Sequence, residues 1–394
     1  MPQTREHLAI IDLLQIHGGL VALTKIDLVD DPEWLDLVEL DLRETLSGTV
    51  LESVPIVRVS AKSGEGIPIL LEKLGNTLTD KPPRPNLFRP RMAVDRVFTM
   101  PGFGTIVTGT LIDGHFQVGE EISIMPHKLN GRIRGLQTHK RKVDIAYPGS
   151  RTAINISGVN VAQIQRGDVV VYPGQYQSTR RLDVSFRLLP DVSQPLKHNT
   201  DVKLFIGASE VISRVRLLGS DSIKPGDEGW LQLELSTPVV CLRGDRYIIR
   251  RPSPGETLGG GIVIDSSPRG RHKRHNKTVI ERLEALIGGS PEDILLQISL
   301  SFGLASKKDI IIGSNLGQES AELAFSNLIN NHKILVLNGN QDAIDSNALI
   351  ASADYWHQLT KKASNEVDTY HNTFPLRPGM PREELKSRLN ISSK

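Results

Sequence analysis

Residues 92–124 constrain the fold of this chain more than any other stretch. They read MAVDRVFTMPGFGTIVTGTLIDGHFQVGEEISI, in which glycine-rich turns separate three runs of β-branched and aromatic residues. Such runs favour β-strands, and glycine supplies the positive φ that tight turns require. The turn at residues 101–104, PGFG, joins the first two runs. This stretch therefore predicts a hairpin within a small, closed β-barrel.

The pattern of apolar residues divides the chain into regions of different fold. Residues 1–80 alternate helical and strand patterns, with helices predicted over 2–17, 31–46 and 67–78, which indicates an α/β domain with a parallel sheet. Two all-β regions follow, and a mainly helical region ends the chain. We therefore expect a multidomain fold, α/β plus all-β, with a proline-rich linker at 80–85, β-barrels at 86–175 and 178–268, and a C-terminal winged-helix region at 269–394.

The winged-helix prediction rests on residues 278–350. Ser306 is expected to cap the helix KKDIIIG, followed by a turn at 313–314 and a second helix over 318–330. The strand KILVL then leads to the asparagine-glycine pair at 338–339, a strong signal for a hairpin turn. Helix-turn-helix followed by a hairpin is the winged-helix pattern, which occurs in nucleic-acid-binding modules and in purely structural ones.

Composition limits the class of protein. The net charge of +2 over 394 residues is not that of a polybasic nucleic-acid binder, so local patches must provide any contact with RNA. The single cysteine, Cys241, excludes an intrachain disulfide, fits a reducing compartment and is expected to be a buried structural residue. The sequence has no signal-peptide pattern and no apolar run long enough to cross a bilayer. We expect a cytoplasmic monomer with no membrane partner.

Two short motifs follow apolar strands in the N-terminal region. TKID at residues 24–27 follows GLVAL, and SAK at residues 60–62 follows PIVRV. An Asp carboxylate can accept hydrogen bonds from N1 and N2 of guanine, which adenine cannot donate, and a Lys stem can cover the base. Each motif alone is more often an ordinary solvated turn. The ordered pair favours a ligand site, because α/β sheets bind ligands at the carboxyl ends of their strands.

Together with the barrel stretch, these motifs resemble the translational GTPases, the group that contains elongation factor Tu. The pattern PGxGTxVTGTxxxGxxxxGE is similar to the barrel that follows the G domain in that group. Thr24 stands where the group usually has Asn, so we expect a weaker grip on the nucleotide. The resemblance implies a P-loop-type G domain that binds GTP or GDP, with Mg²⁺ in the complete factor. It also implies which residues contact the guanine base: Thr24, Lys25, Asp27, Ser60, Ala61 and Lys62.

The phosphate-binding part of such a domain is missing from the sequence. No G-x-x-x-x-G-K-[ST] pattern occurs, and the nearest glycine clusters, at 102–104 and 255–261, lack the Lys-Ser/Thr ending. By comparison with the translational GTPases, we expect a partial G domain that begins after the switch regions. We therefore expect a fragment with weak or absent GTP binding, assign no catalytic residue and no metal ligand, and leave open whether the chain is an enzyme.

The C-terminal region narrows the resemblance. Residues 371–385 read H-x-x-x-P-L-R-P-G-x-x-R-E-E-L, which closely resembles the bacterial selenocysteine-specific elongation factors, the SelB family. The sequence ends within this further helical unit. We therefore expect the last winged helices, which grip the mRNA hairpin in that family, to be absent.

The same resemblance implies an aminoacyl pocket made by Asp95, Arg96 and Arg151. A selenol is far more acidic than a Cys thiol, whose reference pKa is about 8.5, so selenocysteine is largely a selenolate at neutral pH. Two guanidinium groups would favour that anion, and Asp95 is expected to accept from the α-amino group. Without the resemblance, an exposed Asp/Arg pair that binds no ligand would be the favoured interpretation.

The function implied is GTP-dependent delivery of selenocysteinyl-tRNA to the ribosome at recoded UGA codons, with a selenoprotein mRNA hairpin as a further partner. One alternative is a tRNA- or RNA-binding remnant that works without nucleotide. Another is a different elongation factor Tu-like GTPase, against which the winged helix argues. The basic run at residues 269–277 fits RNA phosphates and a solvated linker equally well.

Overall fold

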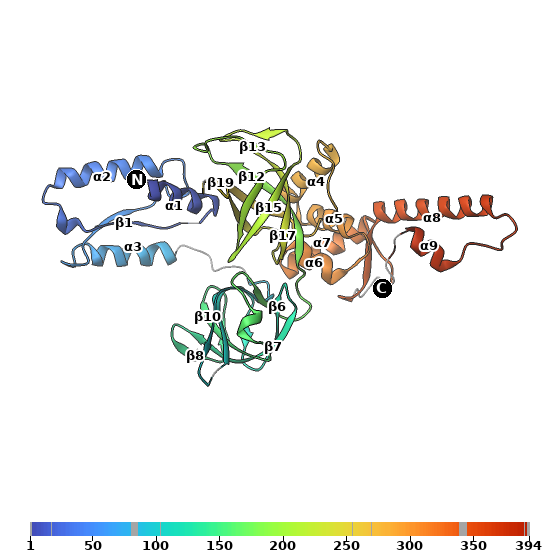
Figure 1. Cartoon of the computed structure of the whole chain (residues 1–394), viewed down its shortest axis with the longest axis horizontal. Coiled ribbons are helices and arrows are strands. Elements are labelled where there is room, and N and C mark those ends of the chain that lie inside the picture. Colours follow the sequence, from blue (N-terminus) through green and yellow to red (C-terminus); the bar gives the residue numbers. More distant parts are fainter. Residues whose placement is uncertain are drawn as a thin grey trace. The chain divides into compact units, whose positions relative to one another are not determined.

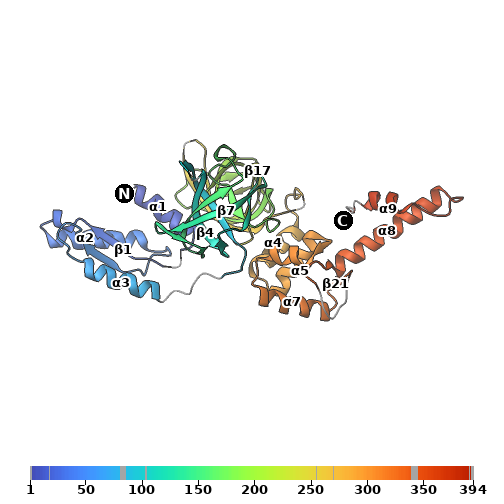
Figure 2. The ribbon, with the colours of Figure 1, turned by 90° about the horizontal axis from the view of Figure 1, so that it is seen from below.

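The computed structural model describes residues 2–16, 18–79, 86–102, 104–253, 255–268, 270–338, 345–389 and 391. The expected linker at 80–85 and Phe103 of the predicted turn lie outside these residues. The chain forms two compact units, one of Met1–Ser267 with His272–His275 and the other of Pro268–Arg271 with Asn276–Lys394. Figures 1 and 2 show their elements from two directions.

The N-terminal lobe, residues 2–79, is α/β. Its two strands are parallel and in register, with Val21 opposite Ile56, and α2 and α3 flank them (Figures 1 and 2). Asp31 caps α2 by accepting from the backbone N–H of Glu33, as the acidic start of this helix predicts. The helix predicted over 2–17 ends earlier, because Gln15 takes a positive φ of 51°. The elements are α1 (Pro2–Leu13), β1 (Val21–Thr24), the 3₁₀ turn η1 (Ile26–Leu28), α2 (Pro32–Leu46), β2 (Ile56–Val59) and α3 (Ile67–Thr79).

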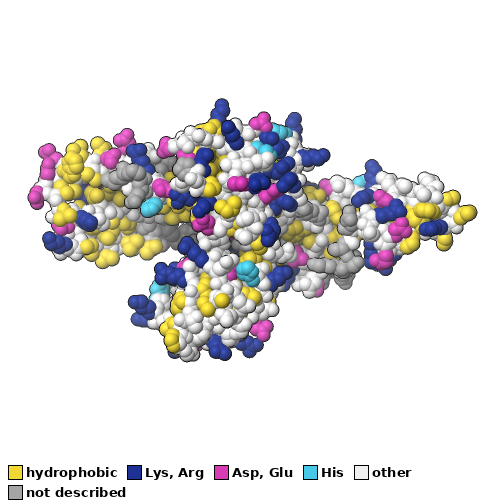
Figure 3. Space-filling model, viewed as in Figure 1, with side chains coloured by type: hydrophobic (Ala, Val, Ile, Leu, Met, Phe, Trp, Pro, Cys, Tyr) yellow, Lys and Arg dark blue, Asp and Glu magenta, His cyan; other side chains and the backbone are white. Residues whose placement is uncertain are grey.

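This lobe exposes much apolar surface. Among the described residues its sheet has two strands, whereas parallel sheets are normally covered on both faces within a larger domain. Apolar side chains gather on the lobe in the space-filling view (Figure 3). The large apolar side chains left exposed on its two flanking helices are Trp34, Leu37, Leu40, Ile69, Leu71, Leu74 and Leu78.

Barrel 1 is the closed sheet predicted from residues 92–124. Its strands follow the order β10-β4-β3-β11-β6-β7, β10 also pairs with β7 to close the barrel, and β8 extends β7. Met100 pairs with Gly104 across the predicted turn, which confirms the hairpin. The elements are β3 (Arg91–Met100), β4 (Gly104–Asp113), β5 (Phe116–Gln117), β6 (Glu121–Met125), β7 (Leu129–Thr138), β8 (Arg141–Val143), β9 (Ile145–Ala146), β10 (Arg151–Ser157), η2 (Val161–Gln163) and β11 (Val169–Val171).

Barrel 2 is a second closed barrel, with strand order β12-β17-β15-β14-β18-β19. Cys241 is buried in its core as a free thiol, which confirms the predicted burial, and this burial raises the pKa of the thiol. The elements are β12 (Thr179–Leu188), β13 (Leu196–Lys197), β14 (Asp201–Ile206), β15 (Ser209–Leu217), β16 (Ser222–Ile223), β17 (Glu228–Val239), β18 (Arg246–Arg250) and β19 (Thr257–Asp265).

The glycines at 259–261 have a packing role in barrel 2. A Cβ atom at Gly259 would lie 2.0 Å from the carbonyl oxygen of Arg187, and one at Gly260 would lie 2.3 Å from that of Tyr247. A Cβ at Gly261 would meet a neighbouring carbonyl oxygen at 2.0 Å. The run therefore lets β19 lie close to both neighbouring strands.

Replacing Gly260 with alanine is expected to lower the free energy of unfolding of barrel 2 by about 1–3 kcal/mol, because the backbone at Tyr247 must shift. Urea unfolding followed at Trp230 on β17, with the two other tryptophans replaced by phenylalanine, would measure the change. Gly255→Ala is the control, because nothing lies within 4 Å of a Cβ placed there. Equal loss in both variants would contradict the packing role.

The C-terminal unit contains the predicted winged helix. Ser306 caps α6, but α6 continues through Ser314, and the turn before α7 is made by Asn315, which has a φ of 55°. Its elements are α4 (Lys277–Gly288), α5 (Pro291–Phe302), β20 (Ala305–Ser306), α6 (Lys307–Ser314), α7 (Gln318–Asn330), β21 (Ile334–Val336), β22 (Leu349–Ser352), α8 (Ala353–Thr373) and α9 (Arg382–Leu389).

The wing of this unit differs from the expected tight hairpin. β21 pairs with β22 in antiparallel register, with Val336 opposite Ile350. The side chain of Asn338 accepts from the backbone N–H of Leu349, eleven residues along the chain. Asn338 therefore faces the opposite strand and does not begin a two-residue turn, and Gly339 lies outside the described residues.

Candidate nucleotide and aminoacyl sites

The two predicted guanine motifs meet at one edge of the N-terminal sheet. Thr24 ends β1 opposite Val59 of β2, so the residues that follow each strand lie side by side. Lys25 has a left-handed φ of 65° and starts η1, which contains Asp27. Ser60 Oγ donates to Oδ1 of Asp27 at 2.7 Å, which joins the motifs directly.

Ser60 organises this edge. It is fully buried, and its hydroxyl oxygen also accepts from the backbone N–H groups of Lys62 at 3.2 Å and Ser63 at 3.1 Å. The loop is closed by Ser60 N–H donating to the carbonyl of Glu65 at 2.9 Å. Asp27 itself stays exposed. The buried hydroxyl therefore orients a carboxylate that a ligand can still reach.

In barrel 1, a β-bulge places Asp95. The register between β3 and β4 slips between Val94 and Arg96, which leaves Asp95 as the extra residue. Thr108 Oγ1 donates to Asp95 Oδ1 at 2.7 Å, and Arg151 Nη1 lies 2.6 Å from Asp95 Oδ2. Asp95 lies in the middle of β3, at the point where the bulge interrupts the pairing of that strand with β4.

Asp95 and Arg151 are joined by an ion pair, and Arg96 follows Asp95 on β3, so the three predicted pocket residues lie in one part of barrel 1. Arg151 is paired with Asp95 although its side chain is 57% exposed. Arg96 is exposed, lies opposite Thr108, and has no ion-pair partner in the part of the chain that the structure describes. The cluster carries a formal charge of +1, since it contains one carboxylate and two guanidinium groups. Thr108 is a fourth member that the sequence analysis missed, although it lies in the VTG motif next to the predicted turn.

A basic hairpin tip adjoins this cluster. His139 and Lys140 form the turn between β7 and β8, both with positive φ, and Arg141 and Lys142 follow them. All four are exposed. Thr138 at the end of β7 pairs with the residue after Arg151 on β10, so tip and cluster share one edge of the barrel. This surface was not predicted from the sequence, although the residues HKRK between two strand patterns indicate it.

Four stretches of the chain match models of known protein families. Residues 1–80 match the elongation factor Tu GTP-binding domain, and residues 104–171 match elongation factor Tu domain 2. Residues 183–270 match the β-barrel domain of selenocysteine-specific elongation factor, and 365–394 match a SelB winged helix. The selenocysteine-specific elongation factor of Desulfomicrobium baculatum is 36% identical over 393 residues, or 98% of this chain. This chain belongs to the SelB family.

Solved structures of SelB proteins share the fold. A bacterial selenocysteine-specific elongation factor EF-Sec matches 99% of this chain and 60% of its own, with a TM-score of 0.78 at 23% identity. SelB from Methanococcus maripaludis matches 68% of this chain and 62% of its own in the apo form, with a TM-score of 0.60 at 26% identity. The same protein in complex with the GTP analogue GPPNHP gives 0.59 at 26% identity, over 68% of this chain and 63% of its own. The chain spans 60% of the length of the Desulfomicrobium relative.

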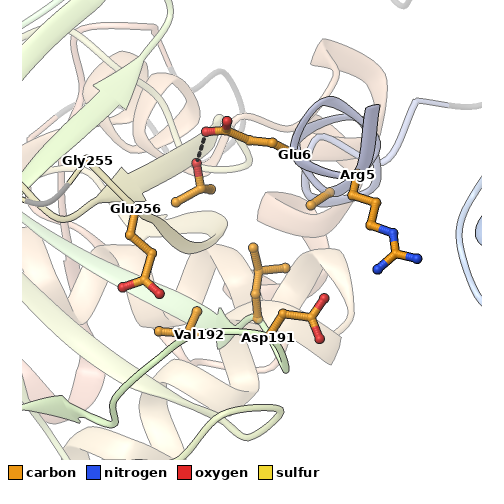
Figure 4. Close-up of a pocket in the computed structure, with 9 residues that line it drawn as sticks. Arg5, Glu6, Asp191, Val192, Gly255 and Glu256 are labelled. Atoms are coloured by element: carbon orange, nitrogen blue, oxygen red, sulfur yellow. Dashed lines mark hydrogen bonds between the residues drawn. The ribbon is translucent and has the colours of Figure 1, made fainter. Parts of the chain in front are cut away.

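In this SelB-family chain, α1 docks on barrel 2 through ion pairs. Glu6 lies 2.8 Å from Arg250 and accepts from the hydroxyl of Thr257 at 3.0 Å, while Asp12 pairs with Arg187. A cleft of about 380 Å³ opens beside these contacts, and Figure 4 shows the carboxylates of Glu6, Asp191 and Glu256 around it. We assign no ligand to this cleft. The ion pairs of Glu6 and Asp12 hold α1 of the N-terminal lobe against barrel 2.

The described residues contain neither a metal-binding cluster nor a membrane-spanning helix. Within them, no group of three or more His, Cys, Asp or Glu side chains is arranged to hold a metal ion. Nor does any helix in the described part of the chain have the length and apolar character needed to cross a membrane.

Proposed function

We propose that this chain is the tRNA-carrying part of a GTP-dependent, monomeric cytoplasmic factor that brings selenocysteinyl-tRNA to the ribosome at recoded UGA codons. The observation that carries the proposal is the Asp95–Arg151 pair, followed on β3 by Arg96, which has no ion-pair partner among the described residues, in a chain of the SelB family. In this proposal residues 1–80 read guanine, 86–175 hold the aminoacyl group, 178–268 contact the tRNA, and 269–394 extend toward the mRNA hairpin.

The charge of the pocket supports selenocysteine as the preferred aminoacyl group. A cluster with a net formal charge of +1 complements a selenolate, whereas a neutral serine hydroxyl or cysteine thiol gains much less from it. When the α-amino group donates to the carboxylate of Asp95, Arg151 is released from its ion pair and can turn to the side chain of the substrate. Arg96 needs no such exchange, so it is the first group to attract the anion.

The basic hairpin tip supports an RNA ligand at the same edge of barrel 1. A tRNA carries its aminoacyl group on a single-stranded 3′ end, whose phosphates must lie near the pocket that holds the amino acid. The cations at residues 139–142 are exposed and adjoin that pocket. The same tip also favours the second candidate function, an RNA-binding module that works without nucleotide.

Binding of tRNA tests the proposal. We expect the chain to bind selenocysteinyl-tRNA at least about tenfold more tightly than the same tRNA carrying serine, which corresponds to one charge-assisted contact. Equilibrium binding of the two fluorescently labelled tRNAs would measure this difference. Equal affinity for both aminoacyl forms, with or without GTP, would favour the nucleotide-independent RNA-binding module.

The guanine site makes a separate prediction. No phosphate-binding residues are assigned among the described residues, so we expect GDP to bind weakly. Asp27→Asn is expected to reduce the affinity for GDP by about tenfold or more. An amide there keeps an acceptor for Ser60 but presents a donor to guanine N1 and N2, where the base needs an acceptor. Titration with GDP and ADP, detected by saturation-transfer NMR, would measure both affinities.

The control for this prediction is Asp30→Asn, which removes a nearby exposed carboxylate outside the motif. It is expected to leave GDP affinity unchanged. Tight GDP binding that survives Asp27→Asn, or equal binding of GDP and ADP by the parent chain, would contradict the assignment.

A further inference from the structure

Three polar side chains form a row across the outer face of barrel 2. Asp183 on β12, Gln232 on β17 and Arg216 on β15 are direct cross-strand neighbours, in that order. Their neighbours along each strand, such as Leu182 and Leu231, belong to the barrel core, so the three polar side chains point outward. Yet Asp183 and Gln232 are both 0% exposed. A segment of chain must therefore cover them.

That segment is residues 272–275, which lie in the connector between β19 and α4 and are grouped with the barrels. All three side chains of the row bind one residue, His272. Its Nε2 lies 2.6 Å from Oδ2 of Asp183, its backbone N–H donates to Oε1 of Gln232 at 3.1 Å, and its carbonyl accepts from Nε of Arg216 at 2.8 Å. Three strands of the barrel thus each provide one side chain that contacts a different group of His272: its imidazole, its backbone N–H and its backbone carbonyl.

Two side chains of the row also form a hydrogen bond with each other. Nε2 of Gln232 donates to Oδ1 of Asp183 at 2.8 Å, so both oxygens of this buried carboxylate have partners. A buried carboxylate without such partners would be strongly unfavourable. The barrel therefore carries a polar pair that is well accommodated only when His272 is seated on it.

A second anchor follows two residues later. Arg274 pairs with Asp221 and donates to the carbonyl of Ser220 at 3.1 Å, and Nε2 of His275 lies 3.4 Å from Asp221. These residues belong to the basic run at 269–277, of which Arg269 lies outside the described residues. Arg274 is thus already engaged by a carboxylate of the barrel, while Lys273 between the anchors remains exposed.

We infer that the basic run is a docked connector and that Asp183, Gln232 and Arg216 form a clamp that holds it through His272. The clamp holds residues 272–275 on barrel 2 just before α4 begins at Lys277. It does not depend on nucleotide, on tRNA or on the proposed function, because every contact is internal to the unit that contains the barrels. If the basic run bound RNA phosphates, we would instead expect its cations to be unpaired and its backbone to be solvated in the chain without RNA.

Hydrogen–deuterium exchange of the whole chain without RNA tests the clamp. Amides 272–275 are expected to be protected in the parent chain, and His272→Ala is expected to speed their exchange by about tenfold or more. His272→Gln is expected to restore most of the protection, because its side-chain amide can still donate to Asp183. Lys273→Ala is the matched control and should leave exchange unchanged. Peptides from β14 would show that the barrel stays folded in every variant.

Two results would overturn the inference. One is exchange of amides 272–275 at the rate of an unstructured peptide in the parent chain, with protection appearing only when tRNA is added, as an RNA-binding arm would behave. The other is protection that is equal in the parent chain and His272→Ala while β14 remains protected. That result would mean that other contacts hold the connector.

Discussion

Replacing Asp245 with alanine is expected to lower the free energy of unfolding of the two barrels by about 3–5 kcal/mol. Asp245 binds Arg91, which lies on β3 of barrel 1 and is 8% exposed, and the pair joins the two barrels. Nη2 of Arg91 donates to Oδ1 of Asp245 at 2.7 Å, and Nη1 donates to the other oxygen. Burial alone would lower the pKa of Arg91, and the carboxylate of Asp245 more than reverses that effect. Without Asp245, a buried guanidinium charge is left uncompensated.

Urea unfolding followed at Trp230 would measure this loss, and two further variants would identify its cause. Asp201→Ala removes a similar Arg–Asp pair, with Arg214, whose side chains are 59% and 53% exposed, so a change below about 1 kcal/mol is expected. Adding Arg91→Met to Asp245→Ala is expected to recover part of the stability, because it removes the unpaired charge. No recovery would mean that the loss comes from the hydrogen bond between the Leu242 N–H and Asp245.

Local sequence signals predicted much of the fold because their physical causes are local. The proline and Asp31 at the start of α2 set its first turn, and the glycines of the turn at 102–104 allow the hairpin between β3 and β4. The guanine motifs were expected to meet because parallel strands present their carboxyl ends at one edge, and the Ser60–Asp27 hydrogen bond agrees with that expectation.

The remaining features depend on contacts between residues far apart in the sequence. Asp95 is placed by a bulge, which depends on how β3 pairs with β4 and has no signal in β3 alone. His272 looked like part of a solvated basic run, because its partner Asp183 lies 89 residues earlier. Asn338 looked like a turn residue, but the pairing of β21 with β22 places it against Leu349. In each case tertiary pairing outweighed the local preference.

The pocket prediction has the largest expected effect on binding. Arg96→Ala is expected to weaken binding of selenocysteinyl-tRNA by about 10- to 100-fold, the equivalent of one hydrogen bond to a charged group, and to change seryl-tRNA binding little. The selectivity between the two should therefore fall toward unity. Arg96 carries the larger share of the effect because it has no ion-pair partner among the described residues, whereas Arg151 must first leave Asp95.

Substitutions at three arginines separate charge from geometry in this pocket. Arg96→Lys keeps the charge but loses the planar fork, so selectivity should be intermediate. Arg151→Ala removes the ion-pair partner that the described residues give Asp95. The cluster then has one carboxylate and one guanidinium group and no net formal charge, which should disfavour the selenolate specifically. Arg132→Ala is the control, because it removes an arginine of the same barrel from an exposed pair with Glu121. If Arg96→Ala and Arg132→Ala reduce binding of both tRNAs equally, the arginines act only as general attractors of RNA, and selenocysteine must be recognised elsewhere.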